Sequence, residues 1–155
     1  MIAPKATLNL MLLIVIVCCS IAACDSSNLE KRTTLYPNGQ LKEEWTVILD
    51  ADSNYISQGL YVAWHENGQK QQEEYWDSGK LNGRFITWYD NGIKRQTGAY
   101  KDGKMNCIYM EWSPDGKKVV EGEMVAGLNQ GKWTFWDENG NIYKQDDFKD
   151  GELIE

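Results

Sequence analysis

The segment Trp88-Tyr89-Asp90-Asn91-Gly92 (WYDNG) decides how the chain folds, because close copies of it recur along the sequence. Its copies are WHENG ending at Gly68, WSPDG ending at Gly116, WDENG ending at Gly140 and a looser form, YPNG, ending at Gly39. From Gly68 onward the final glycines are 24 residues apart. The motif is therefore one part of a repeating unit.

Two further series of residues share this period of 24 and strengthen the case for a repeat protein. One series is Gly79, Gly103, Gly127 and Gly151, and the other is Gly59, Gly83, Cys107 and Gly131, with cysteine at one of its four places. Gly39 lies 29 residues before Gly68, so the first copy carries five inserted residues between positions 40 and 58.

Each copy has the composition of a β-hairpin. Segments of about six residues, such as Arg84-Phe-Ile-Thr-Trp-Tyr89, are rich in aromatic and β-branched residues and are bounded by glycine and asparagine, which is typical of strands. Two strands and two turns fill 24 residues and leave no room for an ordinary helix. The predicted fold is all-β: an elongated, twisted antiparallel sheet of tandem 24-residue hairpins.

The end of each motif predicts a tight turn. Of the last four residues of each motif, the third is Asn or Asp and the fourth is Gly. Two copies have Pro in the second place, as in a type I turn followed by a left-handed glycine. Such a turn with a glycine bulge often closes a hairpin. The glycines predicted to be structural in this way are Gly39, Gly68, Gly92, Gly116 and Gly140.

Two aromatic columns run through the repeat, at an odd spacing that places them on opposite faces of the strands. The column at the head of the motif is Trp64, Trp88, Trp112 and Trp136, and three residues earlier stand Tyr61, Phe85, Tyr109 and Trp133. Both columns could be core. Alternatively, the four tryptophans at the head of the motif form an exposed binding stripe.

The N-terminus has the pattern of an export signal. The apolar run at residues 8–17 follows Lys5 and is too short for a membrane span of about 20 residues. Ile21-Ala-Ala-Cys24 then resembles the lipobox of bacterial lipoproteins, which implies acylation of Cys24 and attachment to a membrane of the cell envelope. An uncleaved signal anchor and ordinary secretion are the alternatives. We expect a signal peptide at 1–23, a tether at 24–33 and a repeat domain at 34–155.

Removal of the signal peptide would change the charge and the cysteine content of the chain. Lys5 is the only charged residue among the first 23, so the net charge of −7 becomes −8. Such a charge argues against nucleic acid and favours a basic partner. With Cys24 acylated, Cys107 is the one remaining free cysteine, and a lone cysteine forms no intramolecular disulfide.

The repeat resembles the MORN family, particularly its bacterial variant, over about residues 36 to 155. Trp88-Tyr-Asp-Asn-Gly-Ile-Lys94 and Lys101-Asp-Gly-Lys-Met-Asn106 carry the resemblance best. Cys107, the segment Val125-Ala-Gly-Leu128 and the stretch from 46 to 58 depart from the pattern. Members are often described as YwqK-type antitoxin-like proteins or as lipoproteins. The resemblance implies a scaffold or a membrane-associated binding module.

The sequence offers little for catalysis, and we predict no catalytic residue and no cofactor. The single histidine, His65, stands at a turn position occupied by Tyr, Ser or Asp in other copies. Adjacent carboxylates such as Glu43-Glu44 and Glu73-Glu74 would point to opposite faces of a strand and could not flank one bond.

The inserted segment contains the only weak candidates for a metal site, Asp50, Asp52 and Asn54, spaced as at the start of a calcium loop. Tyr55 and Tyr61 stand where such a loop needs glycine and glutamate, so an acidic solvated loop is the preferred interpretation.

The predicted function is noncatalytic protein binding by a repeat module displayed as a cell-envelope lipoprotein. An immunity or antitoxin-like role is one alternative. Binding of glycan or peptidoglycan is the other, since tryptophan rings stack on sugar faces.

Overall fold

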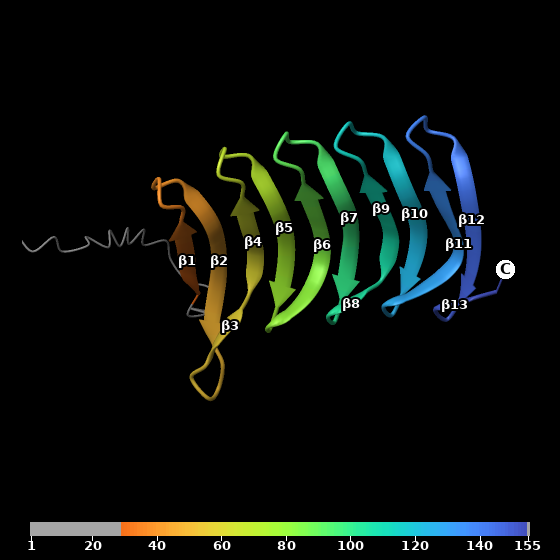
Figure 1. Cartoon of the computed structure of the whole chain (residues 1–155). Coiled ribbons are helices and arrows are strands. Elements are labelled where there is room, and N and C mark those ends of the chain that lie inside the picture. The colour runs from red at the N-terminus through yellow and green to blue at the C-terminus, as the bar shows by residue number, and fades with distance from the viewer. Residues whose placement is uncertain (1–28, 155) are drawn as a thin grey trace, which may run out of the picture.

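A computed structural model describes residues 29–154, which form one open antiparallel sheet of 13 strands and confirm the predicted all-β fold (Figure 1). The strands are β1 (Glu30–Leu35), β2 (Leu41–Leu49), β3 (Tyr55–Ser57), β4 (Gly59–Trp64), β5 (Lys70–Asp77), β6 (Lys80–Trp88), β7 (Lys94–Lys101), β8 (Lys104–Met105), β9 (Cys107–Trp112), β10 (Lys118–Val125), β11 (Leu128–Trp136), β12 (Ile142–Lys149) and β13 (Glu152–Leu153). No helix long and apolar enough to cross a membrane occurs in this part of the chain.

The strands follow one another across the sheet in chain order, so the fold is a simple meander. The short strand β3 pairs with β2 and is followed directly by β4, which also pairs with β2. In the same way, β8 pairs with β7 and is followed by β9, which also pairs with β7. The repeated series Gly59, Gly83, Cys107 and Gly131 lies inside strands or at their first residue rather than in turns. Gly83 has φ of +124° within β6, whereas β9 begins at Cys107.

The WYDNG-type turns lie in a row at one end of the strands. We call this end of the sheet the upper edge and the opposite end the lower edge, as they appear in Figure 1. In the turn at Gly92, the Gly92 N–H donates to the Tyr89 carbonyl at 3.0 Å and the Tyr89 N–H donates to the Ile93 carbonyl at 2.9 Å. All five turn glycines have φ between +82° and +85°, the left-handed region that the sequence pattern predicts.

The turns along the opposite edge have only two central residues. Ser78 and Gly79 have φ of 48° and 78°, so both central residues are left-handed, as in a type I′ hairpin. The pairs at Asp102-Gly103, Ala126-Gly127 and Asp150-Gly151 repeat this geometry. These turns also donate backbone hydrogen bonds to neighbouring segments of the chain, for example from the Gly103 N–H to the Leu81 carbonyl of β6 at 2.8 Å.

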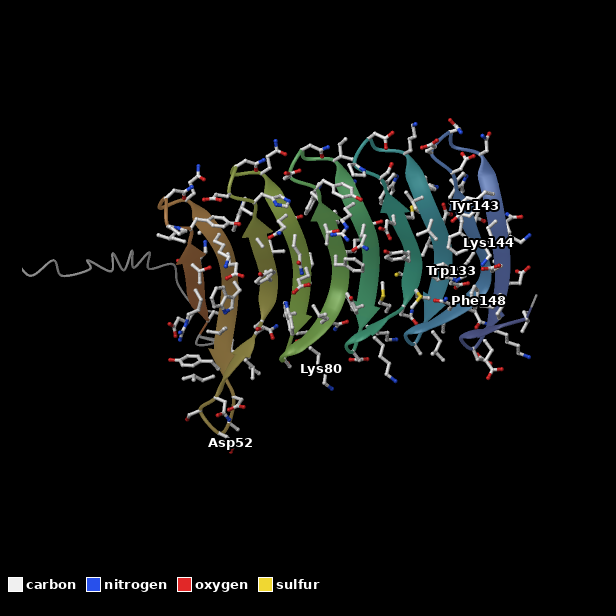
Figure 2. All side chains as sticks on the ribbon, viewed as in Figure 1. Asp52, Lys80, Trp133, Tyr143, Lys144 and Phe148 are labelled. Atoms are coloured by element: carbon white, nitrogen blue, oxygen red, sulfur yellow. The ribbon has the colours of Figure 1, made fainter. Side chains whose placement is uncertain are left out.

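The first repeat differs from the predicted boundaries. Strand β1 begins at Glu30, and residues 30–33 pair with β2 between Glu44 and Val47. The sheet therefore starts four residues before position 34, inside the segment predicted as a tether. The predicted signal peptide and Cys24 lie outside the described residues. The inserted residues form a loop between β2 and β3 that extends beyond the lower edge, with Asp52 near its tip (Figure 2).

The sheet is a single layer. The buried apolar residues within 29–154 are Val47, Val62, Ala63, Phe85, Val120 and Trp133, and none of the large side chains there is completely buried. A sheet of this kind is stabilised by contacts between neighbouring repeats rather than by a second layer. Both of its faces consequently remain accessible to solvent.

Candidate binding surfaces

The two aromatic columns lie on opposite faces of the sheet, as the strand alternation requires. We call the side of Trp64, Trp88, Trp112 and Trp136 the stripe face. The side of Tyr61, Phe85, Tyr109 and Trp133 is the ladder face. The stripe tryptophans end β4, β6, β9 and β11, next to the turns of the upper edge.

The stripe tryptophans are all half-buried, so they are neither a closed core nor a fully open surface. Lysines from the preceding hairpin lie over two of them. The Lys70 ammonium is 5.9 Å from the centre of the Trp88 ring, and the Lys118 ammonium is 5.2 Å from that of Trp136. Cation–π contacts of this kind fix the rings while leaving part of each ring accessible.

The stripe face also exposes large apolar side chains. Leu60 and Tyr75 are cross-strand partners on β4 and β5 and are 39% and 48% exposed, and Ile108 on β9 is 50% exposed. Leu60 lies four residues before Trp64 and Ile108 four before Trp112, so alternation places them on the same face as the tryptophans. The stripe face therefore combines half-buried rings with open apolar surface.

The ladder face holds the best-packed part of the sheet. Phe85 is 7% exposed and Trp133 is 8% exposed. Each ring lies across a glycine of the adjacent strand, Phe85 over Gly98 and Trp133 over Gly122. The Tyr109 and Trp133 rings stack with centroids 6.1 Å apart. Phe85 and Trp133 of the second aromatic column are thus core, and glycines on the adjacent strands make room for their rings, whereas Tyr61 and Tyr109 are half-buried.

Sequence reasoning missed a third periodic column on the ladder face. Trp76, Tyr100, Met124 and Phe148 are also 24 residues apart, and they pack beside the ladder. The centroids of Phe85 and Tyr100 are 5.2 Å apart, and those of Trp133 and Phe148 are 6.1 Å apart. Figure 2 labels Trp133 and Phe148, which lie close together. The period of the sequence contains this signal, but only the strand pairing shows which columns are neighbours.

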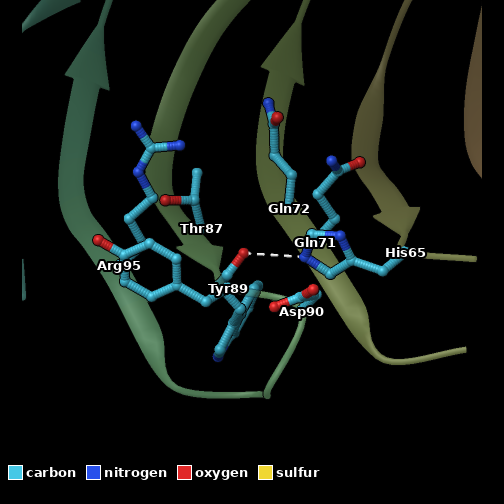
Figure 3. Close-up of a pocket in the computed structure, with 8 residues that line it drawn as sticks. His65, Gln71, Gln72, Thr87, Tyr89, Asp90 and Arg95 are labelled. Atoms are coloured by element: carbon cyan, nitrogen blue, oxygen red, sulfur yellow. Dashed lines mark hydrogen bonds between the residues drawn. The ribbon is translucent and has the colours of Figure 1, made fainter. Parts of the chain in front are cut away.

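His65 has a structural role at the upper edge. Its Nε2 atom lies 3.0 Å from the Trp88 carbonyl, beside a cavity of about 420 Å³ (Figure 3). The hydroxyls of Tyr36 and Tyr89, at the same turn position, donate to the carbonyls of Trp64 and Trp112 at 2.7 and 2.9 Å. Histidine and tyrosine therefore make equivalent links from one turn to the next repeat.

In the inserted loop, the Asp50 carboxylate accepts hydrogen bonds from the backbone of the loop itself. The Asp50 Oδ1 atom accepts the backbone N–H groups of Asp52 and Asn54 at 2.9 and 2.8 Å. The hydrogen bond from the Asn54 backbone is the main reason that the pKa of Asp50 is lowered. Within residues 29–154, no group of three or more His, Cys, Asp or Glu residues could hold a metal ion.

Comparison with protein families gives a match at three places. Residues 31–48, 57–78 and 129–150 match the family described as MORN repeat variant. These segments correspond to the hairpins β1–β2, β4–β5 and β11–β12. A comparison with curated proteins found no match. Three segments of the chain are thus similar to MORN-variant repeats, and the hairpins β6–β7 and β9–β10 between them continue the same turns and register.

Proposed function

We propose that this chain is a noncatalytic binding module that engages another protein through its stripe face. The observation that carries this proposal is the single-layer sheet, which leaves Leu60, Tyr75 and Ile108 exposed beside four regularly spaced tryptophans. Exposed apolar patches on such a surface are typical of protein interaction sites.

The composition of the stripe face supports a protein as the partner. Tryptophan, tyrosine and methionine are enriched in the buried centres of protein interfaces. Ion pairs of Lys70 with Glu73 and of Lys118 with Glu121 lie beside the apolar residues and would supply polar contacts. The excess of acidic residues favours a partner with a basic surface.

The sequence around Cys24 supports display at a bacterial cell envelope. A lipid on Cys24 would join the sheet to a membrane through residues 25–29, because β1 begins at Glu30. More than one acyl chain makes such attachment stable, since each buried methylene contributes about 0.8 kcal/mol. The proposed module would then bind its partner close to the membrane surface.

Site-specific photo-crosslinking of the full-length chain in its host tests the protein-binding role. A benzophenone amino acid replaces Tyr75 or Ile108 on the stripe face, and Asp150 in a turn of the lower edge is the control position. We expect a discrete protein adduct from Tyr75 and Ile108 and little from Asp150. Adducts that form equally at all three positions, or only at Asp150, would contradict the assignment of the face.

The same experiment separates the alternatives. An adduct that shifts on muramidase digestion would indicate peptidoglycan as the ligand. An adduct with a toxin would favour the immunity role. A protein adduct that survives muramidase supports the proposed function.

A further inference from the structure

A small cavity opens on the ladder face at the N-terminal end of the sheet. Its volume is about 230 Å³, below the ~300–1,000 Å³ of typical pockets for drug-sized ligands. The residues that line it come from four successive strands and are all half-buried: Glu43, Trp45, Ser57, Tyr61, Glu74 and Trp76. A cavity of this size suits a compact chemical group.

The strand register brings three aromatic rings around this cavity. Tyr61 on β4 pairs with Glu74 on β5, and the register of β2 with β4 sets Trp45 beside Tyr61. Trp76 on β5 pairs with Gly59, where a Cβ atom would have no neighbour within 4 Å. The absence of a side chain at Gly59 therefore leaves open space opposite Trp76.

Two carboxylates in the cavity accept hydrogen bonds from neutral groups, and only from such groups within residues 29–154. Glu43 accepts the hydroxyls of Thr34 at 2.7 Å and Tyr61 at 3.3 Å. Glu74 accepts the Gln72 amide at 2.6 Å and the indole N–H of Trp76 at 3.0 Å. Each carboxylate oxygen has a second lone-pair direction, so both groups can still accept from a cation.

The neighbouring glutamates on the stripe face differ in this respect. Glu44 pairs with Lys31 at 2.7 Å, and Glu73 pairs with Lys70. Within residues 29–154, neither Glu43 nor Glu74 forms a salt bridge, and the cavity has no lysine or arginine in its lining. Arg32, on the strand beside Trp45, lies over the Tyr55 ring at 4.3 Å and pairs with Glu30 at 2.9 Å.

We propose that this cavity binds an organic ammonium group, most favourably a quaternary one. Aromatic faces attract cations, and cages of such rings recognise methylated ammonium groups, which are weakly hydrated and carry apolar methyl surface. The Glu43 and Glu74 carboxylates would supply the opposite charge. The site lies on the face opposite the proposed protein interface, so it goes beyond the proposed function and does not depend on it.

The later copies do not repeat this combination. In the last copy Asp146 takes the place of Glu74, but it pairs with Lys144 at 2.7 Å. Positions 24 residues after Tyr61, Glu74 and Trp76 hold Phe85, Gly98 and Tyr100. A larger cavity of about 350 Å³ beside Phe85 and Tyr100 has no carboxylate in its lining. The fold therefore requires an aromatic column here, but it does not require the two acids.

The Tyr61 hydroxyl reflects the negative environment of the cavity. Burial, together with the charges of Glu43 and Glu74, raises its pKa to about 12. An arriving ammonium group would offset the charge that disfavours the tyrosinate form.

Titration with choline tests the site in the full-length chain solubilised in a maltoside detergent, which carries no ammonium group. The indole N–H resonance of Trp76, assigned with Trp76→Phe, reports binding because this group donates to Glu74. We expect saturable shifts with choline chloride and none beyond ionic strength with sodium chloride. The neutral isostere 3,3-dimethylbutan-1-ol should bind at least about tenfold more weakly, a difference of about 1.4 kcal/mol.

Matched variants identify the groups responsible. Glu43→Gln and Glu74→Gln should each weaken choline binding at least about tenfold, whereas Glu73→Gln, on the same strand but the other face, should not. Unchanged melting temperatures would show that the variants are folded. Equal binding of choline and its neutral isostere, or wild-type binding by both variants, would overturn the proposal.

A vesicle-binding experiment distinguishes two sources of a choline group, a lipid head group and a free small cation. Flotation of the Cys24→Ser chain with phosphatidylcholine vesicles, but not with phosphatidylglycerol vesicles, would indicate a lipid head group. Choline shifts without flotation would indicate a free small cation. Both results support the ammonium site, and absence of both overturns it.

Discussion

Phe85 lies across Gly98 of the adjacent strand, so closely that a Cβ atom at Gly98 would come 2.5 Å from the ring. A similar close contact joins Trp133 on β11 and Gly122 on β10. These glycines have ordinary strand backbones and are needed for space, unlike the turn glycines, which are needed for their positive φ.

Gly98→Ala should therefore destabilise the sheet by about 1–3 kcal/mol, because the Phe85 ring would have to move out of a well-packed position. Urea unfolding at constant pH measures the effect. Phe85→Leu combined with Gly98→Ala should recover part of the loss, since the smaller side chain leaves room for the methyl group. An unchanged unfolding midpoint in the single variant would show that the contact is not tight.

Gly140→Val should destabilise by more than about 1 kcal/mol for a different reason. Its φ is +82°, and a Cβ atom there would have no neighbour within 4 Å, so the cost comes from the backbone alone. Glu138→Ala in the same turn is the matched control and should have little effect. The reverse ranking in urea unfolding would contradict the turn assignment.

His65 should be replaceable by tyrosine but not by alanine. His65→Ala removes the bond to the Trp88 carbonyl and should cost about 1 kcal/mol, whereas His65→Tyr should keep a link like those of Tyr36 and Tyr89. Thermal unfolding of the two variants measures the difference. Equal loss in both would show that the ring, rather than its hydrogen bond, matters at this position.

Stability should fall in alkaline solution as Tyr61 loses its proton. The pKa of Tyr61 is about 12 in the folded chain, against an ordinary value of 10.0. The folded state then binds more protons than the unfolded state between these values, so its stability is complete below pH 10 and declines from pH 10 toward 12. Urea unfolding across this range should show a smaller decline for Tyr61→Phe, with the remainder owing partly to Tyr109, whose pKa is also raised by burial.

Cys24→Ser should release the protein from the membrane fraction or leave it unprocessed, because the acyl chains would have no attachment point. Fractionation and the apparent mass of the chain measure both outcomes. Unchanged membrane attachment at the mature mass would contradict the proposed lipoprotein anchor.

The periodicity of the sequence was sufficient to predict the hairpins and the left-handed turn glycines, because these depend on local backbone preferences. The sheet begins at Glu30, four residues before the predicted start of the repeat domain at 34, because β1 lacks a WYDNG-type motif before it and is defined only by pairing with β2. The cavity at Trp45 was also beyond sequence reasoning. It depends on which columns of adjacent strands become neighbours, and the five-residue insertion hides the correspondence between β2 and later strands.

Apart from the short strands β3 and β8, neighbouring strands of the sheet are also consecutive in the chain. Assembly therefore needs no distant segments to find each other, and proteins with such low contact order fold quickly. A duplicated hairpin could also be inserted between two repeats, because the one pairing that it separates is replaced by two pairings of the same kind. The length of the module is thus free to change by gene duplication, while a single copy, such as the one around Trp76, acquires a chemistry of its own.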